Sequence, residues 1–237
     1  MMKRWIGGVL VSWAGLVPLS GWAAGVATVQ AGDRTLTVSF DGTAARVDIG
    51  GISQGYLLLR DDTLYTILQM GGRALVMDGA AVAQLLGGRA LKMGPDMIQS
   101  LTGITPTGDH ETVAGRPGAV YTVSYRDVQG RDRSGRAVLG DQPDVRELSQ
   151  VLGRLAVQLQ RVAGGTAAAE PPHEGVPQVQ ETLASRGLGV LAYEQKFRVE
   201  TLTTTPPAAG TLDLPAAAAQ LPSELGQLLH GLTRPSP

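Results

Sequence analysis

The stretch from Thr35 to Ile49 reads TLTVSFDGTAARVDI, and it decides the fold class of this chain. Its apolar residues Leu36, Val38 and Phe40 alternate with threonine and serine, and the alternation resumes at Val47. An Asp-Gly pair separates the two runs. Because successive side chains of a strand point to opposite faces and Asp-Gly favours a tight turn, this pattern is a strong signal for a β-hairpin. The fold therefore contains antiparallel sheet.

The pattern continues along the chain. Tyr56 to Arg60 and Thr63 to Met70 predict a second hairpin across Asp61-Asp62. The pair Gly71-Gly72 then turns the chain into a strand at Arg73 to Met77, which completes a meander. Later strands are predicted at Ala119 to Asp127, Arg136 to Leu139, Leu188 to Tyr193 and Phe197 to Thr203.

Helices are expected in two main regions. Apolar residues recur at helical spacing near residues 79–102 and predict two short helices there. The strongest helix is predicted at residues 144–163, where Asp144 and Glu147 have the spacing of a capping pair. Its apolar stripe consists of Val145, Leu148, Val151 or Leu152, Leu155, Leu159 and Val162.

Residues 24–215 are expected to form a single β-rich domain. Within it, residues 164–177 are rich in glycine, alanine and proline and predict a flexible loop. A short helix near residues 179–185 should follow, and residues 216–237 should form a C-terminal tail or short helix. The predicted fold class is α+β, a curved antiparallel β-sheet with helices across one face.

Residues 1–23 have the pattern of a bacterial export signal. The basic pair Lys3-Arg4 precedes an apolar run from Trp5 to Leu19, and small residues follow. Signal peptidase is expected to cut after Ala23, with a cut after Ala27 as the second possibility. The alternative is an uncleaved anchor, but the run is short of the roughly 20 apolar residues that span a bilayer. We therefore expect a periplasmic protein that does not span the membrane after cleavage.

The charge balance and the absence of cysteine exclude several classes of protein. The chain has 20 Lys and Arg against 21 Asp and Glu, and loss of Lys3 and Arg4 with the signal leaves 18 against 21, a net charge of −3. Nucleic-acid binding relies on clustered basic residues, so no nucleic-acid partner is expected. Without cysteine there are no disulfides and no bacterial lipid-attachment site.

No catalytic or metal-binding pattern is present in the sequence. The three histidines, His110, His173 and His230, stand alone in predicted turn, loop and tail segments, whereas metal sites need several donors at defined spacing. No serine lies in a Gly-x-Ser-x-Gly turn, and the glycine pairs lack the spacing of phosphate loops. We therefore expect no enzyme activity and no cofactor.

An arginine cluster near residue 130 has two interpretations. Arg131, Arg133 and Arg136 could bind an anion, but they alternate with Asp127 and Asp132. Alternating charges are typical of a solvated hairpin. The hairpin is the preferred interpretation.

A methionine-rich apolar segment is the candidate binding site. Methionine is flexible and recurs on surfaces that accept varied apolar partners. The segment is interpreted either as ordinary core or as a hydrophobic groove between helices and sheet that holds an acyl chain or an apolar peptide. The residues concerned are Met70, Met77, Leu85, Leu86, Met93, Met97 and Ile98.

The order of short motifs resembles a known group of proteins. The motifs are Arg46 to Asp48, Tyr56 to Arg60, Thr63 to Leu68, Glu111 to Gly115, Val120 to Val123 and Leu212 to Pro215. Together they resemble uncharacterised bacterial secreted domains whose sheet is similar to that of the outer-membrane lipoprotein carrier (LolA-like) superfamily. The resemblance implies a half-barrel-like antiparallel sheet with helices across its concave face, and no catalytic residue.

These observations predict a non-catalytic periplasmic binding protein for a hydrophobic ligand, namely a lipid, an acyl chain or a lipoprotein. The alternative is a component of envelope protein–protein interactions, with the helix at residues 144–162 or the following loop as its contact. An enzyme is the least favoured class.

Overall fold

The computed structural model of the 237-residue chain describes most of the residues between 23 and 215. The described ranges are 23–49, 55–70, 73–79, 81–82, 98–163 and 175–215.

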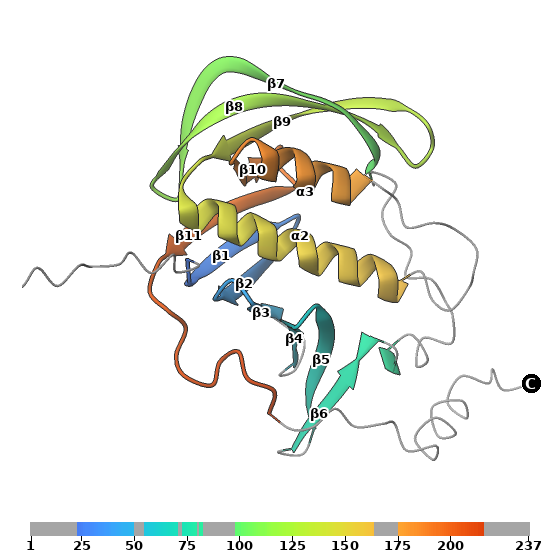
Figure 1. The fold of residues 1–237 in the computed structure, drawn as a ribbon, viewed down its shortest axis with the longest axis vertical. Helices are drawn as coiled ribbons and strands as arrows, with labels where there is room; N and C mark the ends of the chain where they lie inside the picture. Colours follow the sequence, from blue (N-terminus) through green and yellow to red (C-terminus); the bar gives the residue numbers. More distant parts are fainter. Residues whose placement is uncertain are drawn as a thin grey trace, which may run out of the picture.

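Eleven strands and two long helices make up the described fold (Figure 1). The first group of strands is β1 (Gly25–Ala31), β2 (Arg34–Phe40), β3 (Ala44–Ile49), β4 (Gly55–Arg60), β5 (Thr63–Met70) and β6 (Arg73–Asp78). The elements that follow are β7 (Ile98–Val113), β8 (Arg116–Asp127), β9 (Asp132–Gly140), α2 (Pro143–Ala163), α3 (Gly175–Ser185), β10 (Gly189–Tyr193) and β11 (Phe197–Thr203).

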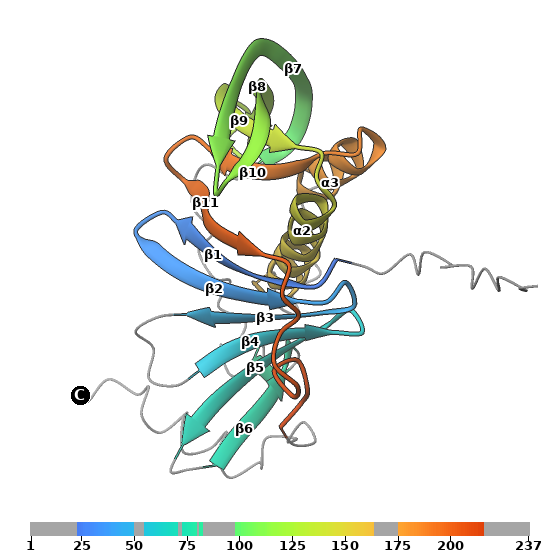
Figure 2. The ribbon, with the colours of Figure 1, turned by 90° about the vertical axis from the view of Figure 1, so that its left-hand side faces the viewer.

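All the strands join one sheet, and every neighbouring pair is antiparallel. The order is β6-β5-β4-β3-β2-β1-β11-β10-β9-β8-β7, so β6 and β7 form its two edges. Strand β1 pairs with β2 on one side and with β11 on the other. The two halves of the chain therefore meet at the centre of the sheet, which curls so that β7–β9 arch over α3 (Figures 1 and 2).

The two predicted hairpins are confirmed, each with a distinct turn. In the first, the Oδ1 atom of Asp41 accepts hydrogen bonds from the backbone of Thr43 and Ala44 at 3.1 and 2.9 Å. In the second, Asp61 and Asp62 have φ values of 49° and 55°. Positive φ at both central residues defines the turn whose twist matches that of the flanking strands.

Two parts of the sheet were not predicted. Strand β1 begins at Gly25, just after the expected signal region 1–23, and the edge strand β7 includes residues 98–102, where a helix was expected. That helix prediction is wrong for these residues. Register shifts after Ile98 and Leu101 each insert one extra residue into β7. As a result Ile98, Leu101 and Ile104 share one apolar cluster, and their spacing of three imitates a helix. Upstream, residues 79, 81 and 82 are helical.

Helix α2 matches its prediction in extent but not in its cap. The backbone N–H of Arg146 donates to the carbonyl of Gln142 at 3.0 Å, so Asp144 lies inside the first turn and is not the capping residue. Its Oδ1 accepts from the N–H of Val145, while its Oδ2 accepts two bonds from Arg116 at 2.7 and 2.8 Å. An aspartate in the first turn still favours the helix through its dipole.

Helix α3 begins at Gly175, so it includes the last three residues of the loop predicted at 164–177. Residues 175–177 are helical, and Pro177 is tolerated because the first turn needs no N–H donor. Gly175 packs directly against the carbonyl oxygen of Ile98, where any side chain would clash. The loop expected at 164–177 therefore ends before Gly175, and residues 164–174 lie outside the described residues.

Three apolar clusters form the core. The largest joins Val145, Leu148, Val151 and Leu155 of α2 to buried residues of β1–β5 and β9–β11. The second lies between α3 and strands β7–β10, and the third lies on strands β4–β6. Helix α2 is thus the element that both halves of the sheet pack against.

Candidate functional site

The structure describes only two side chains of the predicted groove, Met77 and Ile98, and these lie on the two opposite edge strands of the sheet. Met77 lies in β6 and is buried, with 3% of its surface exposed. Met70 ends β5, and its side chain is not among those described. Ile98 begins β7 and packs in the second apolar cluster. The remaining predicted residues, Leu85, Leu86, Met93 and Met97, lie outside the described residues.

An apolar cavity of about 120 Å³ lies between α3 and the strands β7–β10. Ile98 contributes to its wall, and it is the one residue of the predicted groove that does so among those described. Hydrocarbon makes up the wall almost entirely, and Tyr193 brings the one polar side chain among the lining residues. The lining residues are Ile98, Ile104, Val123, Ala137, Leu139, Val179, Leu183, Val190 and Tyr193.

A small residue on β9 leaves this cavity open. Ala137 faces Tyr121 across the β8–β9 ladder and lines the cavity. Its methyl group does not fill the space beneath α3 that a larger side chain would occupy. Protein interiors normally close such gaps, and a cavity with an apolar lining stays dry and can accept an apolar guest. The sequence predicts only that Ala137 lies in a strand. Its small size among larger neighbours was the one local sign of a cavity beside it.

Helix α3 covers the cavity with little buried surface of its own. Of its side chains only Leu183 is fully buried. Two polar contacts attach α3 and the residue after it to the edge strand: Gln178 accepts from the N–H of Leu101 at 2.9 Å, and Arg186, just past the end of α3, donates to the carbonyl of Ile104 at 2.8 Å. Helix α3 also packs against α2, where the side chain of Gln180 lies against Gly153. Because few of its side chains are buried, α3 is the wall of the cavity that local opening would move.

A second, larger hollow of about 600 Å³ runs along the outer side of α2. Its floor is α2, with α3 as one wall and the turns after β2 and β4 as the other. Arg154 crosses it and donates to the carbonyl of Gly42 at 2.7 Å. The lining residues are Gly42, Asp62, Gln150, Gly153, Arg154, Val157, Gln158, Arg161, Pro177, Gln180, Glu181 and Ala184. Seven of these twelve residues carry charged or amide side chains, so we call this the polar cleft, although most of the surface that faces it is hydrocarbon.

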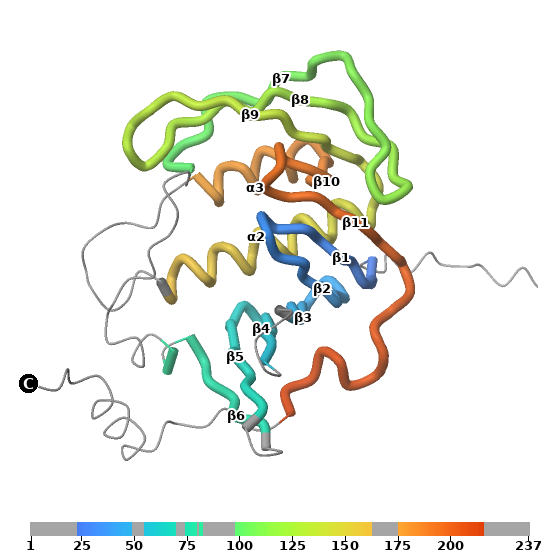
Figure 3. Tube along the Cα trace, turned by 180° about the vertical axis from the view of Figure 1, so that it is seen from behind, coloured from blue at the N-terminus to red at the C-terminus, as the bar shows by residue number. Residues whose placement is uncertain are grey.

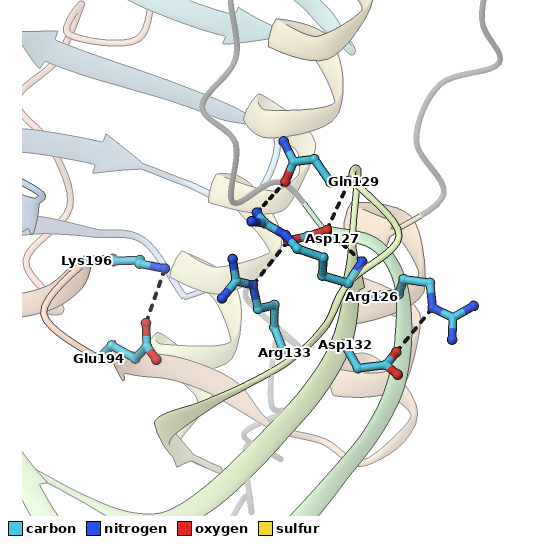
Figure 4. Close-up of polar contacts among 8 residues, drawn as sticks. Arg126, Asp127, Gln129, Asp132, Arg133, Glu194 and Lys196 are labelled. Atoms are coloured by element: carbon cyan, nitrogen blue, oxygen red, sulfur yellow. Dashed lines mark hydrogen bonds and ion pairs between the residues drawn. The ribbon is translucent and has the colours of Figure 1, made fainter.

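The arginine cluster is organised around Asp127, as Figure 4 shows. Asp127 is fully buried, and its Oδ1 accepts from the backbone N–H groups of Gln129 and Arg131 at 3.0 and 2.9 Å. Its Oδ2 accepts from Nε of Arg131 at 2.7 Å and Nε of Arg133 at 3.1 Å. Arg136 donates to Glu111 at 2.7 Å. Because the three arginines bind carboxylates of the chain, the cluster supports the hairpin interpretation.

The pKa of Asp127 reflects these contacts. Burial acts to raise it, but the hydrogen bonds from the backbone of Arg131 and from the Arg131 and Arg133 side chains outweigh burial and lower the pKa from 3.8 to about 2. The carboxylate therefore stabilises the fold above pH 3.8. That contribution is lost as the pH falls from 3.8 towards 2.

We expect Asp127→Asn to lower the melting temperature at pH 7, because the variant keeps the buried site but removes the charge that Arg131 and Arg133 bind. Thermal unfolding from pH 7 to pH 2 measures this, and the difference from wild type should shrink as Asp127 becomes protonated. The control is Asp132→Asn, which removes an exposed ion pair with Arg126 and should stay within about 1 kcal/mol of wild type. A pH-independent deficit in Asp127→Asn would contradict this account.

Glu147 on α2 is a second buried acid, and its pKa is shifted in the opposite direction from that of Asp127. Its Oε1 atom is buried without a hydrogen-bond partner in the described structure. Burial raises its pKa, while Arg154 acts to lower it and Asp41 to raise it. A raised carboxyl pKa makes the folded state less stable as the pH rises through that pKa, because the unfolded chain releases the proton first. Glu147 therefore lowers stability at neutral pH.

The described residues show no metal centre. No group of three or more His, Cys, Asp or Glu lies close enough within them to hold an ion. His110 lies in strand β7 opposite Ala119 and not in the predicted turn. Within the same part of the chain, neither helix combines the length and the apolar character needed to cross a membrane.

Comparison with protein-family models, with curated proteins and with solved structures finds no match to this chain. The function must therefore be inferred from the chain itself. It offers two candidate sites, the apolar cavity beneath α3 and the polar cleft along α2.

Proposed function

We propose that this chain is a non-catalytic periplasmic binding protein for a hydrophobic ligand, namely a lipid, an acyl chain or a lipoprotein. The observation that carries the proposal is the apolar cavity of about 120 Å³ beneath α3. An engineered apolar cavity of about 150 Å³ binds benzene, so a space of this size suits one small apolar group. The LolA-like resemblance of the motifs, with its half-barrel shape, points in the same direction.

A complete acyl chain needs more room than this cavity offers. Ligand pockets usually measure roughly 300–1,000 Å³. The weakly buried α3 would have to move away from β7 to reach that size. Met97 immediately precedes Ile98 and Met93 lies four residues before Met97, so both remain, with the other groove residues, the predicted continuation of the site.

Two measurements test this proposal. Native mass spectrometry of the protein from its own envelope should show bound lipid, and an apolar naphthylamine probe should gain fluorescence when it binds the delipidated protein. A protein that carries no lipid and leaves the probe dark would exclude the proposed function.

The proposed location depends on export. Cleavage after Ala23 would leave β1 complete, whereas cleavage after Ala27 would remove the start of β1, including the buried Ala27, which pairs with Val38 and Leu202. We therefore expect the mature chain to begin at Ala24. N-terminal sequencing of the exported protein measures this, and a chain that begins at Thr28 or retains Met1 would overturn the prediction.

The polar cleft along α2 favours a second function, a role in envelope protein–protein interactions. It has the size of a ligand pocket, and its wall combines hydrocarbon surface with charged and amide side chains, a mixture that suits a protein partner. A photo-crosslinking side chain at Gln158 in the cleft should capture a defined partner in envelope extract. The same side chain at the exposed Thr201 on β11 serves as the control.

A further inference from the structure

The third apolar cluster lies on the face of the sheet opposite α2. Along β4, Leu57 and Leu59 belong to the cluster beneath α2, whereas Tyr56 and Leu58 belong to the third cluster. Alternate residues of a strand point to opposite faces, so the two clusters lie on opposite sides of the sheet. We name the third cluster the β4–β6 patch, and its buried members are Tyr56, Leu58, Ile67 and Val76.

The segment after β11 reaches this patch. Residues 204–215, here called the C-terminal strap, leave the centre of the sheet and run towards β4–β6, as the orange-red trace shows in Figures 2 and 3. Leu214 packs against the patch, and it is the one member of the cluster, among the described residues, that does not come from a strand. An apolar patch that packs against a non-strand segment of its own chain is a site that accepts such a segment.

One side chain attaches the tip of the strap. Nη1 of Arg60 donates to the carbonyl of Leu212 at 3.3 Å and to Oδ1 of Asp213 at 3.1 Å. The N–H of Asp213 in turn donates to the carbonyl of Gly210 at 3.2 Å, and Gly210 has a φ of +81° that favours glycine. The tip is therefore a shaped turn that directs one carboxylate to Arg60 and one leucine to the patch.

The attachment is weak. The side chains of Arg60 and Asp213 are 41% and 70% exposed, and exposed ion pairs contribute little because water and salt screen them. Between Thr204 and Pro207 no hydrogen bond to the sheet occurs within the described residues, and most of this stretch is exposed. The strap is held chiefly by Leu214 and by its covalent connection.

We propose that the β4–β6 patch is a docking surface for a short turn-forming peptide of a partner protein in which a carboxylate side chain stands between aliphatic residues, and that the strap occupies this surface in the free protein. Arg60 donates hydrogen bonds to the carboxylate and to the preceding carbonyl, and the aliphatic side chain packs against the patch. Because the strap is tethered, it competes at an effective concentration of the order of 1 mM. A partner peptide therefore binds strongly only when the strap leaves.

The test uses the full chain and a fluorescein-labelled peptide, Gly-Thr-Leu-Asp-Leu-Pro, which is the sequence of residues 210–215. Fluorescence anisotropy gives its affinity for wild type and for the variant Asp213→Lys/Leu214→Ser, in which the strap is repelled and loses its apolar anchor. We expect at least about ten-fold tighter binding to the variant, because the tethered competitor is removed. A scrambled peptide serves as the control.

A second variant, in which the charge of residue 60 is reversed, tests the proposal independently of Asp213→Lys/Leu214→Ser. Arg60→Glu at an exposed position should repel the strap, reject the aspartate peptide and bind a peptide with lysine in place of aspartate. Equal affinity of both peptides for wild type and Arg60→Glu would overturn the proposal, as would equal affinity of the aspartate peptide for wild type and Asp213→Lys/Leu214→Ser. The cavity beneath α3 lies in another cluster, so probe binding there is expected to stay unchanged in all these variants.

Discussion

Ala137→Leu is expected to abolish binding of the apolar naphthylamine probe while leaving the melting temperature within about 4 °C of wild type. The substitution places three more carbon atoms into the cavity beneath α3, which measures about 120 Å³. At roughly 24 cal/mol per Å³, filling the cavity contributes up to about 3 kcal/mol, and this offsets the strain of a larger side chain. Titration of the probe and thermal unfolding measure the two effects.

The matched control is Ala192→Leu. Ala192 is also a buried alanine on a strand, but it belongs to the cluster beneath α2 and does not line the cavity. Overpacking there should cost about 1–3 kcal/mol and leave probe binding intact. If Ala137→Leu is as destabilised as Ala192→Leu and still binds the probe, the cavity is not the ligand site.

Local patterns in the sequence predict the local elements of this fold. The Asp41-Gly42 and Asp61-Asp62 turns, the strands beside them and α2 all depend on neighbouring residues, and the structure has them where they were expected. The start of strand β7 was missed because the two extra residues between Ile98 and Gly103 turn an alternation of two into a spacing of three. Its pairing with β8 resolves that ambiguity, because Ile98 lies opposite Asp127 at the far end of this long hairpin, and a local pattern does not show that pairing.

The candidate site was harder to predict than the fold. Methionine content pointed to a groove, but Met77 is buried. Ile98 does line the cavity, whereas most of the wall comes from β8–β10 and α3. The empty volume exists because Ala137 and Val190, more than 50 positions apart, reach the same space beneath Leu183 without filling it. Such emptiness is a property of packing between elements, and no single stretch of sequence encodes it.

Leu148→Ala is expected to lower the free energy of unfolding by about 2–5 kcal/mol, because it leaves a cavity in the largest apolar cluster. Leu148 is fully buried on α2. Denaturant unfolding measures the loss. The control is Leu159→Ala on the same helix, where the leucine is only partly buried and the cost should be clearly smaller.

The same variant tests whether α2 joins the two halves of the sheet into one cooperative unit. The cluster around Leu148 includes Val47 from β3 and Leu191 from β10, which lie on opposite sides of the central strands β1 and β11. If α2 couples the halves, the free energy of opening measured by hydrogen exchange in Leu148→Ala should fall by the same amount at amides of β3 and β10. Both strands would then exchange only through global unfolding. Faster exchange in only one of these strands would show that the two halves unfold separately. In that case α2 unfolds together with the half whose exchange rate increases.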